Sequence, residues 1–313
     1  MRPGKQMVRG LILVGIRIAQ GLAHFLPWHW GTRIGRLLGI TAYYLLSKER
    51  QKVIDHLHLA LADRLSSGEI RSTARACFAH LGMGFLELLN LPRLGKDRLA
   101  DLVEIEGEEN LFKPMSQGRG VIYISGHIGN WELMAVVVAL KGYPLKVIAA
   151  PIYDKRLDAL MTRHRARFGI ETIQRGSTQA ARQILSGLRK GYMLAFLIDQ
   201  DIQMEGTYVD FFGHSAYTPI GPTALALHSE VPVVMGYTHR LENGRHRIIF
   251  EEPLTLVRTG NSEADIQSNT ALFTKHLEGF IRRRPEQWVW MHRRWATAKP
   301  SASGEDKRAR SHG

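Results

Sequence analysis

The chain has 313 residues, 44% of them hydrophobic. This excludes a disordered or fibrous protein and allows one large domain or a main domain with a helical extension. The net charge of +13 indicates an anionic partner: nucleic acid, an anionic lipid surface or an acidic protein. The single cysteine, Cys77, excludes an internal disulfide and is compatible with a reducing compartment.

The first 30 residues are predicted to form a membrane-associated helix. Residues 11–26 are mostly apolar, and no small-x-small cleavage site of a secretory signal follows them. A crossing helix would place Arg17 in the bilayer at a cost of about 2.5–3.5 kcal/mol. Arg17, Gln20 and His24 form one polar stripe. We therefore expect a helix that lies in or dips into the membrane, with Trp28 and Trp30 at the interface, and a crossing helix stays the alternative.

Residues 31–100 are predicted to be a helical region. Ser66 followed by Glu69 is typical of a capping box, so a helix is expected over residues 70–91, where Pro92 ends it.

From about residue 118 strands and helices alternate. Strands are predicted at Val121–Ser125, Leu145–Ala150, Tyr192–Asp199, Val231–Tyr237 and Arg247–Glu251. Helices are predicted at Trp131–Lys141, Arg156–Phe168, Thr178–Lys190, Pro222–Glu230 and Ser262–Arg283. This order predicts an α/β fold with a mostly parallel central sheet flanked by helices, spanning residues 101–298, and a disordered tail over residues 299–313.

The stretch Gly126–Glu132 carries the strongest chemical signal. On a continuous helix, the five-residue spacing of His127 and Glu132 would turn the two side chains about 140° apart. They can meet if His127 lies in a loop after the strand and Glu132 in the first turn of a helix, with Asn130 as the N-cap. The pair would then be a general base and its orienting acid. A lone histidine at a strand end is more often structural.

Two further groups of charged residues are candidates for a functional site. Asp199 and Asp201 follow a predicted strand, as in a metal-binding D-x-D motif of sugar-nucleotide transfer, although we favour a role in fixing a basic residue. Of Arg163, Arg165 and Arg167, at least one is expected to point inward, where its planar group suits phosphate or carboxylate.

Two apolar segments have open roles. The loops Phe211–Gly213 and Thr218–Thr223 are expected to form a turn or to contact an acyl chain. Gln287–Trp295 alternates aromatic and basic residues, which suits single-stranded nucleic acid or a membrane interface, and the N-terminal helix favours the membrane. The chain has no nucleophile elbow, P-loop, Rossmann fingerprint or zinc motif, so His127 and Glu132 most simply activate a hydroxyl that attacks an acyl carbonyl directly.

In this order the motifs resemble the glycerolipid acyltransferase superfamily, and its lipid A biosynthesis branch of late acyltransferases in particular. The segments that carry the resemblance are Gly126–Glu132, Arg165–Gly169, Asp199–Asp201, Phe211–Gly213, Gly221–Pro222 and Pro285–Trp295.

The resemblance implies an enzyme at the cytoplasmic face of the inner membrane. It would move an acyl chain from acyl carrier protein, or CoA, to a hydroxyl of a lipid A precursor, without metal or organic cofactor and without nucleic acid. His127 would be the base and Glu132 its partner, and Arg165, Asp199 and Asn130 would bind substrate. The alternatives are acylation of another glycolipid such as a mannosylated phosphatidylinositol, a D-x-D glycosyltransferase, and a non-catalytic basic protein that binds membrane or RNA.

Overall fold

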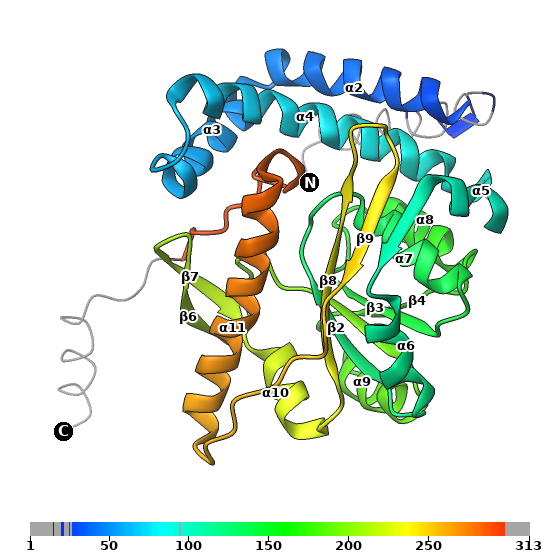
Figure 1. Cartoon of the computed structure of the whole chain (residues 1–313), viewed down its shortest axis with the longest axis vertical. Coiled ribbons are helices and arrows are strands. Elements are labelled where there is room, and N and C mark those ends of the chain that lie inside the picture. The colour runs from blue at the N-terminus through cyan, green and yellow to red at the C-terminus, as the bar shows by residue number, and fades with distance from the viewer. Residues whose placement is uncertain (1–14, 16–19, 22–24, 26, 94, 298–313) are drawn as a thin grey trace.

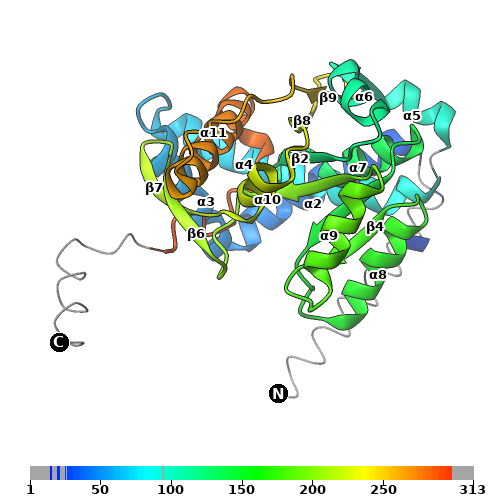
Figure 2. The same cartoon turned by 90° about the horizontal axis from the view of Figure 1, so that it is seen from below.

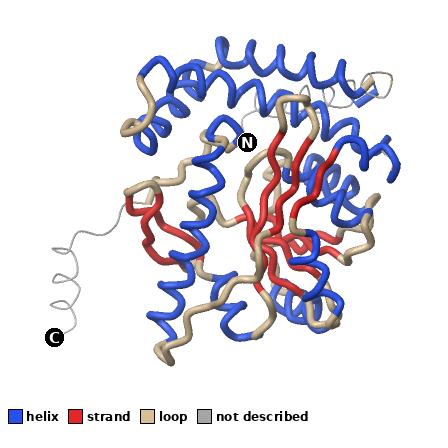
Figure 3. Tube along the Cα trace, viewed as in Figure 1, coloured by secondary structure: helices blue, strands red, loops and turns tan. Residues whose placement is uncertain are grey.

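A computed structural model describes residues 15, 20–21, 25, 27–93 and 95–297. The predicted tail and most of the predicted N-terminal helix lie outside these residues. The structure confirms an α/β fold with a mostly parallel central sheet flanked by helices (Figures 1 and 3). The division of the chain into domains stays a prediction.

The central sheet has seven strands in the order β1-β9-β8-β2-β5-β3-β4. Neighbouring strands are parallel except β8 and β9, which pair antiparallel. The strands are β1 (Val103–Glu106), β2 (Val121–Ser125), β3 (Leu145–Ala149), β4 (Glu171–Gln174), β5 (Met193–Leu197), β8 (Val233–Arg240) and β9 (His246–Phe250). The sequence analysis missed β1 and β4, which are four-residue strands at the two edges of the sheet.

A separate hairpin, β6 (Gly206–Phe211) and β7 (His214–Pro219), was also missed. Its turn is the predicted apolar loop. Phe212 and Gly213 have φ angles of 58° and 78°, as two-residue hairpin turns require. Figure 2 shows this hairpin and α11 at the end of the molecule opposite α8 and β4.

Helices cover both faces of the sheet. Their bounds are α2 (Trp28–Leu45), α3 (Ser47–Leu61), α4 (Ser67–Asn90), α5 (Lys96–Leu102), α6 (Glu108–Ser116), α7 (Trp131–Leu140), α8 (Lys155–Ala166), α9 (Ala180–Arg189), α10 (Gly221–Ser229) and α11 (Ser262–Arg283), with 3-10 turns at Leu91–Arg93 and Pro285–Gln287. The expected capping box of Ser66 and Glu69 is present at α4. Side chains alternate along β2, so Ile122 and Ile124 face the core shared with α10 and α11, whereas Tyr123 faces the core shared with α6 and α7.

Glycines determine how α2 packs. Gly31, Gly35 and Gly39 form its buried face. A Cβ on Gly35 would lie 2.5 Å from the carbonyl oxygen of Gly82 in α4, so the two backbones are in direct contact. The opposite face of α2 is therefore left outside, and Trp30 is half exposed there, while Trp28 packs against the core. Within the described part of the chain, no helix has the length and apolar character needed to cross a membrane.

The C-terminal aromatic segment packs most of its aromatic side chains into the core and exposes Arg293, which corrects the membrane-interface prediction. Trp288 and Trp290 are fully buried, and Arg294 is 1% exposed. Arg294 can be buried because its guanidinium donates to the Tyr217 carbonyl and the Thr218 hydroxyl. Hydrogen bonding thus converts a pattern typical of an interface into core structure.

Candidate active site

The pairing of β2 with β5 brings His127 and Asp199 together. Ser125 lies opposite Leu197 in this parallel pair, and the two candidate residues each follow two positions later. The Asp199 carboxylate accepts from the His127 ring Nδ1 at 2.8 Å and from the His127 backbone N–H at 2.7 Å. The prediction that Asp199 fixes a basic residue is confirmed, and that residue is His127.

A third hydrogen-bond donor contacts the Asp199 carboxylate. The Trp288 indole Nε1 donates to Asp199 Oδ2 at 2.7 Å. The Trp288 segment is held in place by the loop that carries His127, because Gly129 N–H donates to the Gln287 carbonyl and Val289 N–H to the His127 carbonyl. The buried tryptophan is therefore a positioning residue for the carboxylate.

The charge of Asp199 determines the tautomer of His127. Burial alone would raise the pKa of the Asp199 carboxyl, but the His127 ring, the His127 amide and the Trp288 indole hold that pKa well below its usual range. An ionised carboxylate only accepts hydrogen bonds, so Nδ1 of the imidazole carries the proton. Nε2 of His127 then carries the lone pair, as a general base requires.

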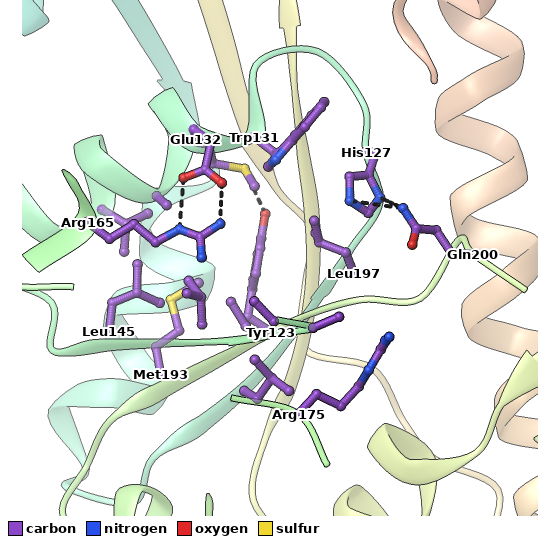
Figure 4. Close-up of a pocket in the computed structure, with 18 residues that line it drawn as sticks. Tyr123, His127, Trp131, Glu132, Leu145, Arg165, Arg175, Met193, Leu197 and Gln200 are labelled. Carbon is purple, nitrogen blue, oxygen red and sulfur yellow. Dashed lines mark hydrogen bonds and ion pairs between the residues drawn. The ribbon is translucent and has the colours of Figure 1, made fainter. Parts of the chain in front are cut away.

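Glu132 does not hold the imidazole, which corrects the predicted pairing. It lies in the first turn of α7 as expected, but its two carboxylate oxygens accept from Arg165 Nε at 3.1 Å and Nη2 at 2.5 Å (Figure 4). The physical reason is that Asp199 already occupies Nδ1 of His127, while Arg165 of α8 lies directly against Glu132 on the opposite side of the cavity from His127. The prediction that at least one of the three arginines points inward is confirmed by Arg165, whereas Arg163 and Arg167 are exposed.

Asn130 supports the loop from behind. Its side-chain oxygen accepts from the Leu133 amide at 3.0 Å, which confirms the predicted N-cap of α7, and its Nδ2 donates to Glu87 at 2.8 Å. Gly129 has a φ of 62°, and a Cβ there would lie 2.0 Å from the Thr238 carbonyl oxygen. Asn130 is thus buried with both polar atoms engaged, a position that does not fit the predicted contact with substrate.

Glu87 of α4 centres a buried polar cluster beneath this loop. It forms an ion pair with Arg240 and a 3.2 Å contact with His246 Nε2. Burial would raise the pKa of Glu87, but His246 and Arg240 hold it well below its usual range. The cluster ties α4 and β8 to the catalytic loop through Asn130.

The imidazole of His80 is buried near the Glu87 cluster, and we therefore expect the stability of the fold to fall at acidic pH. Burial is the main cause that lowers the pKa of His80 to about 3. Because the unfolded chain then takes up this proton first, the free energy of unfolding should fall by about 1.4 kcal/mol per pH unit from this group as pH drops below about 6.5, down to the folded pKa. Urea unfolding at several pH values should show that His80→Leu has the shallower slope. The exposed His58→Leu serves as the control, and an unchanged slope in His80→Leu would contradict the assignment.

A cavity of about 250 Å³ opens beside His127. Its polar part is lined by His127, Glu132, Arg165 and Gln200, as Figure 4 shows. Its deeper part is apolar and lies between the sheet and α7, where Leu145 and Met193 are each 1% exposed. The arrangement can hold a hydrocarbon chain in the interior with a polar group at the base.

Three residues near the base were missed by the sequence analysis. Gln200 Nε2 lies 2.8 Å from Nε2 of His292. It also lies 3.4–3.5 Å from both ring nitrogens of His127, so it contacts the edge of that imidazole without pointing at one nitrogen. Burial is the main cause that lowers the pKa of His292 to about 4, which keeps this second imidazole neutral near pH 7. Among the described residues, none forms a hydrogen bond or ion pair with the guanidinium of Arg175, which also lines the cavity. Gln200 stands inside the D-x-D run and His292 inside the aromatic segment, so both were adjacent to recognised signals.

The two D-x-D carboxylates have separate partners. Asp199 holds His127, whereas Asp201 accepts from the backbone N–H and hydroxyl of Thr297 at 2.7 and 2.9 Å. In the part of the chain that the structure covers, no group of three or more His, Cys, Asp and Glu side chains is placed to hold a metal ion. This geometry gives no support to the D-x-D glycosyltransferase alternative.

Comparison with known proteins finds one matching family and several relatives. The family model described as bacterial lipid A biosynthesis acyltransferase matches residues 6–297. A lipid A biosynthesis acyltransferase of Haemophilus influenzae is 22% identical over 98% of this chain and 99% of its own length. The lipid A biosynthesis palmitoleoyltransferase of Escherichia coli is 26% identical over 85% and 84% of the two chains. A phosphatidylinositol mannoside acyltransferase of Mycolicibacterium smegmatis is 22% identical over 71% of each.

Proposed function

Because this chain belongs to the bacterial lipid A biosynthesis acyltransferases, we propose that it transfers a fatty acyl chain from acyl carrier protein, or from coenzyme A, to a hydroxyl of a lipid A precursor. The observation that carries this proposal is the His127 imidazole at the mouth of an apolar cavity, with its Nδ1 held by a buried carboxylate so that Nε2 is the basic nitrogen. An imidazole in that position suits deprotonation of an alcohol next to an acyl chain.

The transfer needs one base and no covalent enzyme intermediate. The acceptor hydroxyl donates to Nε2 of His127, and its oxygen attacks the carbonyl carbon of the donor thioester. As the C–O bond forms, the hydroxyl proton passes to Nε2, and Asp199 stabilises the resulting imidazolium. The tetrahedral intermediate collapses with cleavage of the C–S bond, and the imidazolium returns the proton to the leaving thiolate.

Arg165 and Glu132 form the polar wall opposite the base. Glu132 occupies two N–H groups of the guanidinium and leaves the others free to donate to substrate oxygen atoms. Hydrogen bonds from a cation to a developing oxyanion or a phosphate are stronger than neutral ones. In this proposal Arg165 contacts substrate and Glu132 positions Arg165.

The outer face of α2 suits a bilayer surface. Its large apolar side chains recur at helical spacing, and they are Trp30, Ile34, Leu37, Leu38 and Leu45. Arg33, Arg36 and Lys48 are exposed on or next to the same helix, and cations there favour anionic lipid headgroups. The proposed location is the cytoplasmic face of the inner membrane, where the acidic carrier protein and the lipid acceptor meet.

This surface predicts an effect on lipid binding. Replacing Leu37 and Leu45 together by Glu should weaken binding to phosphatidylethanolamine–phosphatidylglycerol vesicles by at least about tenfold, since both side chains lose apolar contact with the bilayer. Phe112→Glu, at another exposed apolar position, is the matched control. Vesicle co-sedimentation measures both, and equal binding of the double variant and the control would remove α2 from the proposed membrane contact.

The function itself is tested with purified components. The protein is incubated with acyl-acyl carrier protein and either a lipid A precursor or a mannosylated phosphatidylinositol, and products are identified by mass spectrometry. The proposal expects an acyl mass added to the lipid A precursor. Addition only to the mannosylated lipid would favour the second acceptor, to which the similarity with the mycobacterial enzyme points. Modification of neither lipid would contradict the proposed acyl transfer.

A further inference from the structure

A second apolar space lies on the other face of the sheet. It is a groove of about 440 Å³ between α9, α10 and the start of the β6–β7 hairpin. Ile184, Leu185, Phe196, Ile202 and Leu225 are among the side chains that line it. In the mechanism above this groove has no occupant.

The groove and the catalytic cavity meet at the carboxyl edge of the sheet. Side chains of a strand alternate between its faces, so Met193 and Ala195 of β5 line the cavity whereas Phe196 lines the groove. Ile148, Arg175 and Leu197 line both spaces. Two apolar sites therefore converge where His127 lies, one from each face of the sheet.

The two spaces differ in access. In the deep part of the cavity Leu145 and Met193 are each 1% exposed, so a chain enters it end-on. The groove is bordered by partly exposed side chains, with Leu185 40% and Met204 46% exposed. A chain that stays attached to a large headgroup can lie lengthwise in such an open groove.

We propose that this groove holds the hydrocarbon chain of the lipid acceptor that carries the reacting hydroxyl, while the cavity holds the donor acyl chain. The inference rests on the proposed function, because it divides two hydrocarbon chains between two sites.

Arg175 stands where the two chains would meet. Its side chain is half-buried and extends toward the side of the cavity on which His127 and Gln200 lie (Figure 4). Without a protein anion as partner in the described structure, its guanidinium is available to a carbonyl or phosphate oxygen of the acceptor. The groove thus combines an apolar lining with one cation, the Arg175 guanidinium, at its inner end.

Matched substitutions separate the two sites. Ala181→Phe places a ring in the groove from the exposed face of α9, and Gln183→Phe on the same helix, outside the groove, is the control. We expect Ala181→Phe to raise KM for the lipid acceptor by about tenfold or more and to leave KM for the acyl donor within about twofold. Ala195→Phe, in the cavity, should raise KM for the donor instead. A rise in donor KM for Ala181→Phe, or no difference from the control, would overturn the assignment.

A second measurement does not depend on turnover. A lipid A precursor with a photoreactive diazirine in its hydroxyacyl chain is bound to the His127→Ala variant, irradiated, and the labelled peptides are mapped by mass spectrometry. Labels on α9 and α10 would support the groove. If the unmodified protein transfers no acyl chain in the assay above, the same labels would refute the proposed function and leave the groove assignment in place. Labels confined to α7 and β5, or no label at all, would overturn the groove assignment.

Discussion

Replacement of His127 by Ala should lower kcat for acyl transfer by about 10²–10⁴-fold, the usual contribution of a positioned general base. In the proposed mechanism the imidazole is the base at the mouth of the cavity, and the His292 ring lies edge-on against it with ring centroids 5.0 Å apart. Initial rates with acyl-acyl carrier protein and lipid A precursor measure the effect.

The same variant should keep its fold and its lipid binding. His127 is half-buried near the start of the loop that follows β2, and the carboxylate it leaves behind still accepts from Trp288 and the backbone. Circular dichroism and vesicle co-sedimentation check these properties, and His58→Ala, at an exposed position on α3, controls for loss of a histidine as such. Turnover near that of the unmodified protein would show that another group accepts the proton.

Replacement of Asp199 by Asn should be nearly as damaging, with a loss of about 10²–10⁴-fold in kcat. One carboxylate oxygen accepts from two N–H donors, the His127 amide and the Trp288 indole. The amide oxygen of the variant must take that position, so its NH₂ group faces Nδ1 of His127. Nδ1 then has to accept, the ring proton moves to Nε2, and the base is lost; a catalytic triad loses about 10⁴-fold for the same reason.

Comparison with Glu132→Gln decides whether Asp199 or Glu132 is the partner of the His127 imidazole. This substitution disrupts the pair with Arg165 but leaves the contact between His127 and Asp199 in place. We expect its kcat to fall less than that of Asp199→Asn under the same assay. A larger loss in Glu132→Gln would restore Glu132 as the partner of the imidazole and contradict the geometry described above.

Local pattern predicted much of the fold correctly. The strand Val121–Ser125 and the helix Ser262–Arg283 have the predicted bounds, because each is a run of consistent periodicity between clear end signals. The capping box at Ser66 and the N-cap at Asn130 were also found, since a cap depends on residues within one turn. The short edge strands and the β6–β7 hairpin were missed, because they are too short or too polar to show a clear alternation of apolar and polar residues.

What the sequence by itself determined is the set of reactive groups: a histidine and an aspartate at two strand ends, and a glutamate in the first turn of a helix. Only the tertiary structure decided which carboxylate meets the imidazole. That choice depends on β2 lying next to β5, a contact between residues 72 positions apart. The same long-range packing buried Trp288 against Asp199 and turned Glu132 toward Arg165. Hydrogen-bond partners across a sheet follow from the order of its strands, and the spacing of residues along the sequence does not determine that order.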